Sequence, residues 1–97
     1  MKIIIPEKVI KSCIVDENGQ RCAIGVLVGA LWPEYNSKYI APILDSLRDW
    51  LTLQGLKDPD QWLSETAYRN NTTDDDAARR VFCSESLRAI PGVEVVL

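Results

Sequence analysis

Residues 23–32 read Ala-Ile-Gly-Val-Leu-Val-Gly-Ala-Leu-Trp and contain no charged, amide or hydroxyl side chain. The segment is rich in small residues, which favours a helix over a strand, and a helix that is apolar on all sides is a buried one. A glycine costs a helix about 1 kcal/mol relative to alanine. We therefore expect another element to approach Gly25 and Gly29 closely, and Pro33 to end the helix.

The sequence after this segment predicts two helices with clear boundaries. Apolar residues recur at helical spacing over 39–53, with Pro42 in the first turn and Gly55 just past the end. Asp58-Pro59-Asp60-Gln61 has the pattern of a capping box with proline at the first helical position. It predicts a second helix from there to about Tyr68.

A last helix is predicted after a loop at residues 70–73. Thr73 is the expected N-cap, and three aspartates follow it, at positions where the helix dipole favours negative charge. The helix is expected to end near Ala89, because Pro91-Gly92 cannot continue it.

Both chain ends are predicted to be β-strands. Residues 2–5 form a run of β-branched side chains stopped by a proline, and residues 93–97 are almost entirely apolar. Pairing the two segments in one small sheet ties down both termini. Asn18-Gly19 favours a tight turn in the middle of 13–22, so a short hairpin is a candidate neighbour of this sheet. The expected fold class is α+β, one domain over residues 1–97, with about four helices covering the sheet.

The composition argues against most catalytic and metal chemistry. Histidine is absent, which removes the commonest general base and metal ligand. The three cysteines lack the spacing of a zinc site. We expect no catalytic residue, no cofactor and no metal, and we expect reduced thiols in a cytosolic chain. Cys13 and Cys22 flank the predicted turn, and whether they form a disulfide bond is left open.

The charges and the apolar runs bear on partners and location. Lysine and arginine total 11 against 14 aspartates and glutamates, a net charge of −3, and the basic residues are scattered. Nucleic-acid binding needs a basic stripe, so no nucleic-acid partner is expected. The longest apolar run, residues 22–32, is shorter than the about 20 residues that span a bilayer. With no signal-peptide pattern at the start, we expect a cytoplasmic protein without a membrane partner.

Three aromatic residues lie in the loop between the first two predicted helices. Trp32, Tyr35 and Tyr39 are the candidate protein-interaction residues, because tryptophan and tyrosine are enriched at interface hot spots. The alternative is that these rings close over the edge of the core.

Parts of the chain resemble an uncharacterised family of small bacterial and phage domains. The resemblance rests on the hairpin-like segment from Cys13, on the pattern Arg-Cys-Ala-x-Gly-x-Leu at 21–27, and on an Asn-Asn…Asp segment before the last helix. It covers residues 13–31 and 70–82. The family's longer N-terminal helix is shortened here to 6–11, and the C-terminal strand is not a feature of the family. The resemblance implies a bacterial or phage source and assigns no activity.

These observations favour a small acidic protein-interaction module without catalysis, such as a bacterial or phage accessory or anti-defence factor. One alternative is a ligand-binding or regulatory domain with an apolar pocket beside the Gly25/Gly29 helix. A second is an enzyme that uses carboxylate pairs, Asp45 with Asp49 or Asp58 with Asp60. A further alternative is a homodimer in which the edges of the two terminal strands pair with a second copy of the chain.

Overall fold

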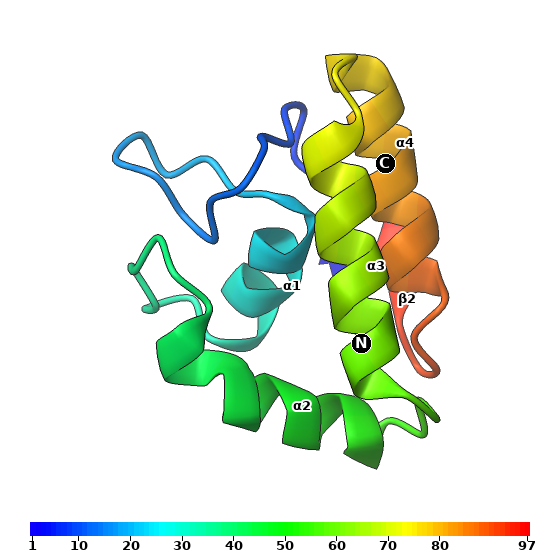
Figure 1. The fold of residues 1–97 in the computed structure, drawn as a ribbon. Helices are drawn as coiled ribbons and strands as arrows, with labels where there is room; N and C mark the ends of the chain where they lie inside the picture. Colours follow the sequence, from blue (N-terminus) through cyan, green and yellow to red (C-terminus); the bar gives the residue numbers. More distant parts are fainter.

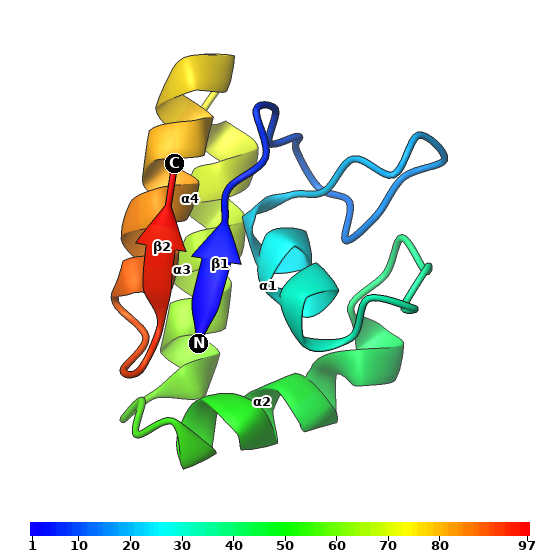
Figure 2. The same ribbon diagram turned by 180° about the vertical axis from the view of Figure 1, so that it is seen from behind.

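A computed structural model describes all residues from Met1 to Leu97, and in it the two chain ends lie side by side. Strand β1 (Lys2–Ile4) pairs in parallel with strand β2 (Glu94–Val96), and Ile3 is the register partner of Val95. Figure 2 shows the two arrows pointing the same way. Ile3 and Val95 are buried while Ile4 is exposed, so one face of the sheet is covered. The predicted pairing of the termini is confirmed.

Four α-helices connect the strands. They are α1 (Ala23–Leu31), α2 (Leu44–Leu53), which follows the short 3-10 helix η1 (Ala41–Ile43), α3 (Pro59–Thr72) and α4 (Asp76–Arg88). Helix α1 contacts α3 and α4, which pack against each other, and α2 lies across one end of the group (Figure 1). The expected α+β class is therefore confirmed. None of these helices combines the length and the apolar composition that crossing a bilayer requires.

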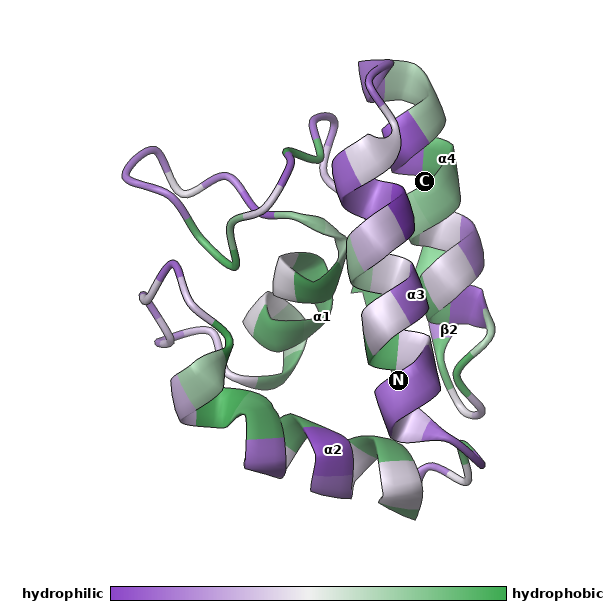
Figure 3. Ribbon diagram, in the orientation of Figure 1, coloured by the Kyte–Doolittle hydropathy of each residue, from purple (hydrophilic) through white to green (hydrophobic).

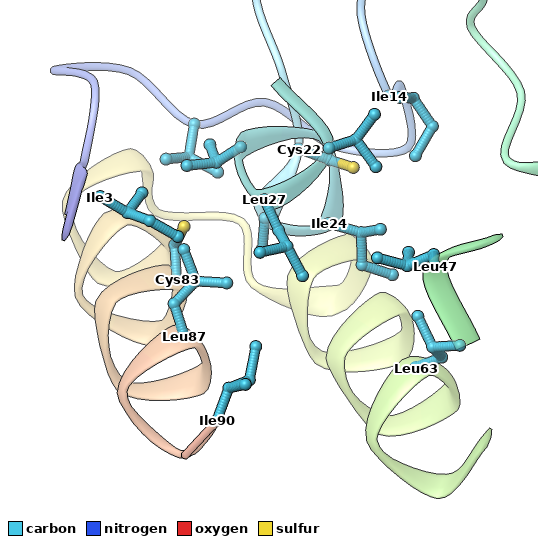
Figure 4. Close-up of a cluster of buried hydrophobic side chains, with 14 of the residues drawn as sticks. Ile3, Ile14, Cys22, Ile24, Leu27, Leu47, Leu63, Cys83, Leu87 and Ile90 are labelled. Atoms are coloured by element: carbon cyan, nitrogen blue, oxygen red, sulfur yellow. The ribbon is translucent and has the colours of Figure 1, made fainter. Parts of the chain in front are cut away.

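Helix α1 is the centre of the core, as its composition predicts. Every residue from Ala23 to Val28 is buried. Figure 3 shows α1 apolar along most of its length, whereas α2 alternates between polar and apolar residues. Leu27 lies between the helices that carry Leu63 and Leu87 (Figure 4), and all three side chains belong to one buried hydrophobic cluster.

The two glycines of α1 meet close neighbours, also as expected. A Cβ atom on Gly25 would lie 2.1 Å from the backbone oxygen of Ile14. A Cβ on Gly29 would lie 2.8 Å from the Cζ atom of Arg21, whose Nη1 donates to the Gly25 carbonyl at 3.1 Å. The neighbour is the loop before α1 and not another helix.

The two glycines differ in what an added methyl group would displace, and this predicts different stabilities. Gly25→Ala forces a backbone carbonyl to move, and overpacking of this kind costs about 1–3 kcal/mol of unfolding free energy. Gly29→Ala meets only the end of a flexible arginine, and the better helix propensity of alanine offsets about 1 kcal/mol. Urea denaturation of both variants checks this, and equal destabilisation would contradict it.

The predicted hairpin at residues 13–22 does not form strands. Its turn is present, with Gly19 at φ +78°, and the Cys22 amide donates to the Cys13 carbonyl at 2.7 Å. The Asp16 side chain accepts from the amides of Asn18 and Gln20 at 2.9 and 2.8 Å. Because this carboxylate binds the local backbone donors, the segment closes as a loop and adds no third strand to the sheet.

The predicted loop at residues 70–73 is wrong, since α3 continues through Thr72. The reason is a tertiary contact. Asn70 is 1% exposed, and its Oδ1 accepts from the Ala23 amide at the start of α1 at 3.1 Å. Its Nδ2 donates to the Ile10 carbonyl at 3.1 Å. These bonds outweigh the weak helix propensity of asparagine.

The cap of α4 also differs from the prediction. Thr73 donates its hydroxyl to the Arg69 carbonyl at 2.6 Å and so belongs to the end of α3. Asp75 is the N-cap, and its side chain accepts from the Ala78 amide at 2.8 Å. The extension of α3 explains the two-residue shift, because Thr73 is already used there.

Arg79 is a buried cation that the sequence did not single out. It is 4% exposed, and its guanidinium donates to the Thr73 carbonyl at 2.7 and 2.9 Å and to the Val9 carbonyl at 2.8 Å. It also donates to the Asp76 carboxylate at 2.8 Å. Arg79 thus joins the N-terminal loop to the turn between α3 and α4.

Removing this guanidinium is expected to destabilise the protein strongly. Arg79→Met leaves buried carbonyls without donors, and each orphaned group costs about 1–3 kcal/mol. We expect a loss of about 3 kcal/mol or more in unfolding free energy, with Arg79→Lys restoring only part of it because lysine lacks the planar fork. Arg88→Met, at an exposed position of the same helix, is the control. Similar denaturation midpoints for both methionine variants would contradict this role.

Candidate functional site

A cleft of about 400 Å³ opens beside the first turn of α1. Its walls come from α1, from α3, from the start of α2 and from the loops at 12–14 and 38–40. Eight of the 13 lining residues are hydrophobic, among them Ile14, Ile24, Leu63 and Ala67. The volume and the apolar lining are typical of sites that bind small molecules.

One wall of the cleft is fixed by asparagines of α3. The Asn71 Oδ1 accepts from the Ser12 amide at 2.9 Å and from Asn70 Nδ2 at 3.2 Å. Ser12 has φ +64°, a left-handed conformation that is uncommon for a residue with a side chain. The Asn71 amide therefore holds a strained residue at the edge of the cleft, a feature that clusters at functional sites in proteins.

Cys22 contributes both to the cleft and to the helix beside it. It is the N-cap of α1, and its Sγ accepts from the Gly25 amide at 3.4 Å. Burial raises the pKa of the Cys22 thiol, and burial likewise raises the pKa of Cys83 to about 12. Both groups are therefore thiols at neutral pH, while a nucleophilic cysteine needs a lowered pKa. All three cysteines are free, including Cys13.

The mouth of the cleft carries a cation and an aromatic ring. The Ile14 amide donates to the Lys38 carbonyl at 3.1 Å, which joins the two loops. The Lys38 side chain is 54% exposed, and its Nζ lies 3.8 Å from the Glu17 carboxylate. Tyr39 also lines the cleft and is 71% exposed. The cleft thus combines an apolar lining with two exposed polar side chains, Tyr39 and a lysine that is paired with Glu17.

The three predicted interaction residues lie in different environments. Trp32 and Tyr35 are half-buried and pack against the hydrophobic core. The Tyr35 hydroxyl donates to the Tyr39 carbonyl, which places both residues at one end of the loop. Tyr39 is the one largely exposed ring of the three.

Three of the four carboxylates considered for catalysis, Asp45, Asp58 and Asp60, serve other contacts. Arg48 donates to Asp45 at 2.9 Å and to Asp60 at 2.6 Å, so these two acids share one arginine on the surface. The pKa of Arg48 is raised by its hydrogen bond to Asp60. Asp58 caps α3 through the Gln61 amide at 3.0 Å. No group of three or more cysteine, aspartate or glutamate side chains is placed to hold a metal ion.

The α3 wall of the cleft was not anticipated from the sequence. The sequence predicts a loop for residues 70 and 71, whereas Leu63 and Ala67 fall within the predicted helix. A signal was present in the spacing of Leu63, Ala67 and Asn70, which lie one above the other on a helix. This spacing places Asn70 on the apolar face of the helix and is compatible with a helix that continues past Tyr68.

The cleft is not the apolar pocket expected beside Gly25 and Gly29, because neither glycine lines it and Gly29 lines a separate surface groove. The cleft meets α1 at Cys22 and Ile24, whereas Gly25 is covered by Ile14.

Comparisons with known protein families, with curated protein sequences and with solved structures found no match to this chain. The geometry of the cleft is therefore the basis for assigning a function.

The burial of the thiols predicts their order of modification. Iodoacetamide at pH 8 is expected to modify half-buried Cys13 in the folded protein. Cys22 and Cys83 are expected to react only after denaturation, because both are buried and their raised pKa values keep them protonated. Mass spectrometry of the digested protein measures each site. Fast native modification of Cys22 would show that the cleft floor opens in solution.

Proposed function

We propose that this chain is a non-catalytic binding domain whose ligand occupies the cleft beside α1. The observation that carries the proposal is the combination of an apolar floor, formed by residues such as Ile24 and Leu63, with Lys38 and Tyr39 at the mouth. A site with a hydrophobic lining and few polar groups is the usual form of a small-molecule site. The Tyr39 ring and the hydroxyls of Ser12 and Ser64, which also line the cleft, would orient a ligand that enters from solvent.

The arrangement favours a small amphipathic ligand. Its hydrocarbon or aromatic body would replace water against Ile24, Leu63 and Ala67, and burial of apolar surface contributes about 25 cal/mol per Å². A single anionic or polar head would remain near Lys38 and would compete there with the Glu17 carboxylate, which lies 3.8 Å from the Lys38 Nζ. A dianionic ligand would lack a second cation among the lining residues.

Filling the cleft is expected to weaken binding without harming the fold. Ala67→Leu places extra volume at a half-buried lining position, and Ala77→Leu makes the same change on the exposed side of α4. The fluorescent probe 1-anilinonaphthalene-8-sulfonate has the expected apolar body and single negative charge. We expect Ala67→Leu to weaken its binding by about tenfold or more, equivalent to about 1.4 kcal/mol.

Near-ultraviolet circular dichroism must be unchanged in both variants, because this dye also binds loosely packed states. Methyl resonances of Ile24 and Leu63 should shift when the dye binds to the unmodified protein. Equal dye affinity for Ala67→Leu and Ala77→Leu, or shifts confined to other residues, would contradict the proposal.

A protein partner is the second candidate, and the exposure of Tyr39 is what favours it. A tyrosine that is 71% exposed beside an apolar cleft resembles the rim of an interface hot spot, and the cleft would then accept an apolar side chain of the partner. Competition between the dye and a short peptide carrying one tryptophan tests this candidate. A peptide that displaces the dye, with weaker displacement for Tyr39→Ala, would support it.

A further inference from the structure

The outer edge of β1 has no neighbouring strand. In the parallel register, the backbone groups of alternate residues of β1 point toward β2. The Glu94 amide donates to the Met1 carbonyl at 2.7 Å, and the Ile5 amide donates to the Val96 carbonyl at 2.8 Å. The amides and carbonyls of Lys2 and Ile4 therefore point to the opposite edge. The sheet ends there, since it contains only two strands.

A groove of about 410 Å³ runs along this free edge. The strand side of the groove includes Lys2, Ile4 and Pro6, and the helix side includes Val26 and Gly29 of α1. Figure 2 shows β1 facing α1 on the side away from β2, with no strand between them. Ile4 is 72% exposed, which is unusual for an isoleucine in a strand that has a protected edge.

The groove is positively charged although the protein as a whole is acidic. Lys2 and Arg21 both line it, and neither forms one of the ion pairs of the chain. Arg80, near the end of β1, donates to the carbonyls of Pro6 and Ile5 at 2.8 and 3.4 Å and has no acidic partner either. No carboxylate side chain lines the groove. In a chain with a net charge of −3, two lining cations without a lining carboxylate favour a negatively charged occupant, and the nearest acid to Lys2 in the sheet register is Glu94 on β2.

We propose that the free edge of β1 binds an extended acidic peptide segment by strand addition. Main-chain hydrogen bonds to Lys2 and Ile4 supply affinity, and alternate side chains of the peptide supply specificity. The acidic side chains of the peptide lie on the same face as Lys2 and Ile4, where they meet Lys2, while the apolar side chains on its opposite face pack on Val26. A second copy of this chain fits less well, because pairing β1 with itself brings the cations of both grooves together. The proposal uses a different surface from the cleft and does not depend on it.

The test uses a short acetylated peptide of alternating valine and glutamate, with a comparator N-methylated at alternate residues to remove one row of donors. We expect the first peptide to slow amide hydrogen exchange of Ile4 by about tenfold or more, and the comparator to leave it unchanged. Lys2→Glu is expected to weaken peptide binding about three- to tenfold. Lys57→Glu is the matched control, because Lys57 is exposed, forms no ion pair and does not line the groove.

Several results would overturn the proposal. The first is no binding at millimolar peptide, and the second is binding that leaves hydrogen exchange of the Ile4 amide unchanged. The third is an equal loss of affinity in Lys2→Glu and Lys57→Glu, which would reflect net charge alone. Sedimentation showing a dimer whose Ile4 amide is already protected would assign the edge to a second copy. Filling the cleft with Ala67→Leu should not alter peptide binding, so failure here and failure of the cleft proposal are distinguishable.

Discussion

Burial of residues 23–28, the first six residues of α1, is the constraint on which the rest of the structure depends. A helix without a polar face cannot lie at the surface, so other elements must surround it. Helices α3 and α4 pack against it, β1 lies beside it, and the loop before it covers Gly25. The glycines allow that loop to approach the helix backbone. The cleft and the groove both occur where this enclosure is incomplete.

The loop between β1 and α1 is held by side chains of the last two helices. Residues 5–22 contain no regular secondary structure, so their backbone groups need other partners. Arg79 donates to the Val9 carbonyl, Asn70 donates to the Ile10 carbonyl, and Asn71 accepts from the Ser12 amide. These contacts explain why α3 and α4 bury Asn70 and Arg79. They also position the loop that forms part of the cleft wall.

The cleft and the β1 groove have complementary chemistry. The cleft offers an apolar interior with a charged entrance, which suits a small molecule or a single side chain. The groove offers free backbone hydrogen-bonding groups together with Lys2 and Arg21, which suits an extended chain. Their linings share no residue, although both border α1 and both involve the loop before it. A ligand that changed the position of this loop would therefore affect both surfaces.

The sequence alone determined the elements whose cause is local. The apolar run at 23–32, the capping residue Asp58 and the β-branched ends are local patterns, and the helices and the two terminal strands follow from them. Only the tertiary structure decided the end of α3, the cap of α4 and the walls of the cleft. Asn70 resembles a loop residue until the Ala23 amide and the Ile10 carbonyl are placed beside it. The physical reason is that a polar side chain gains from burial only when distant backbone groups meet it, and local sequence does not specify those partners.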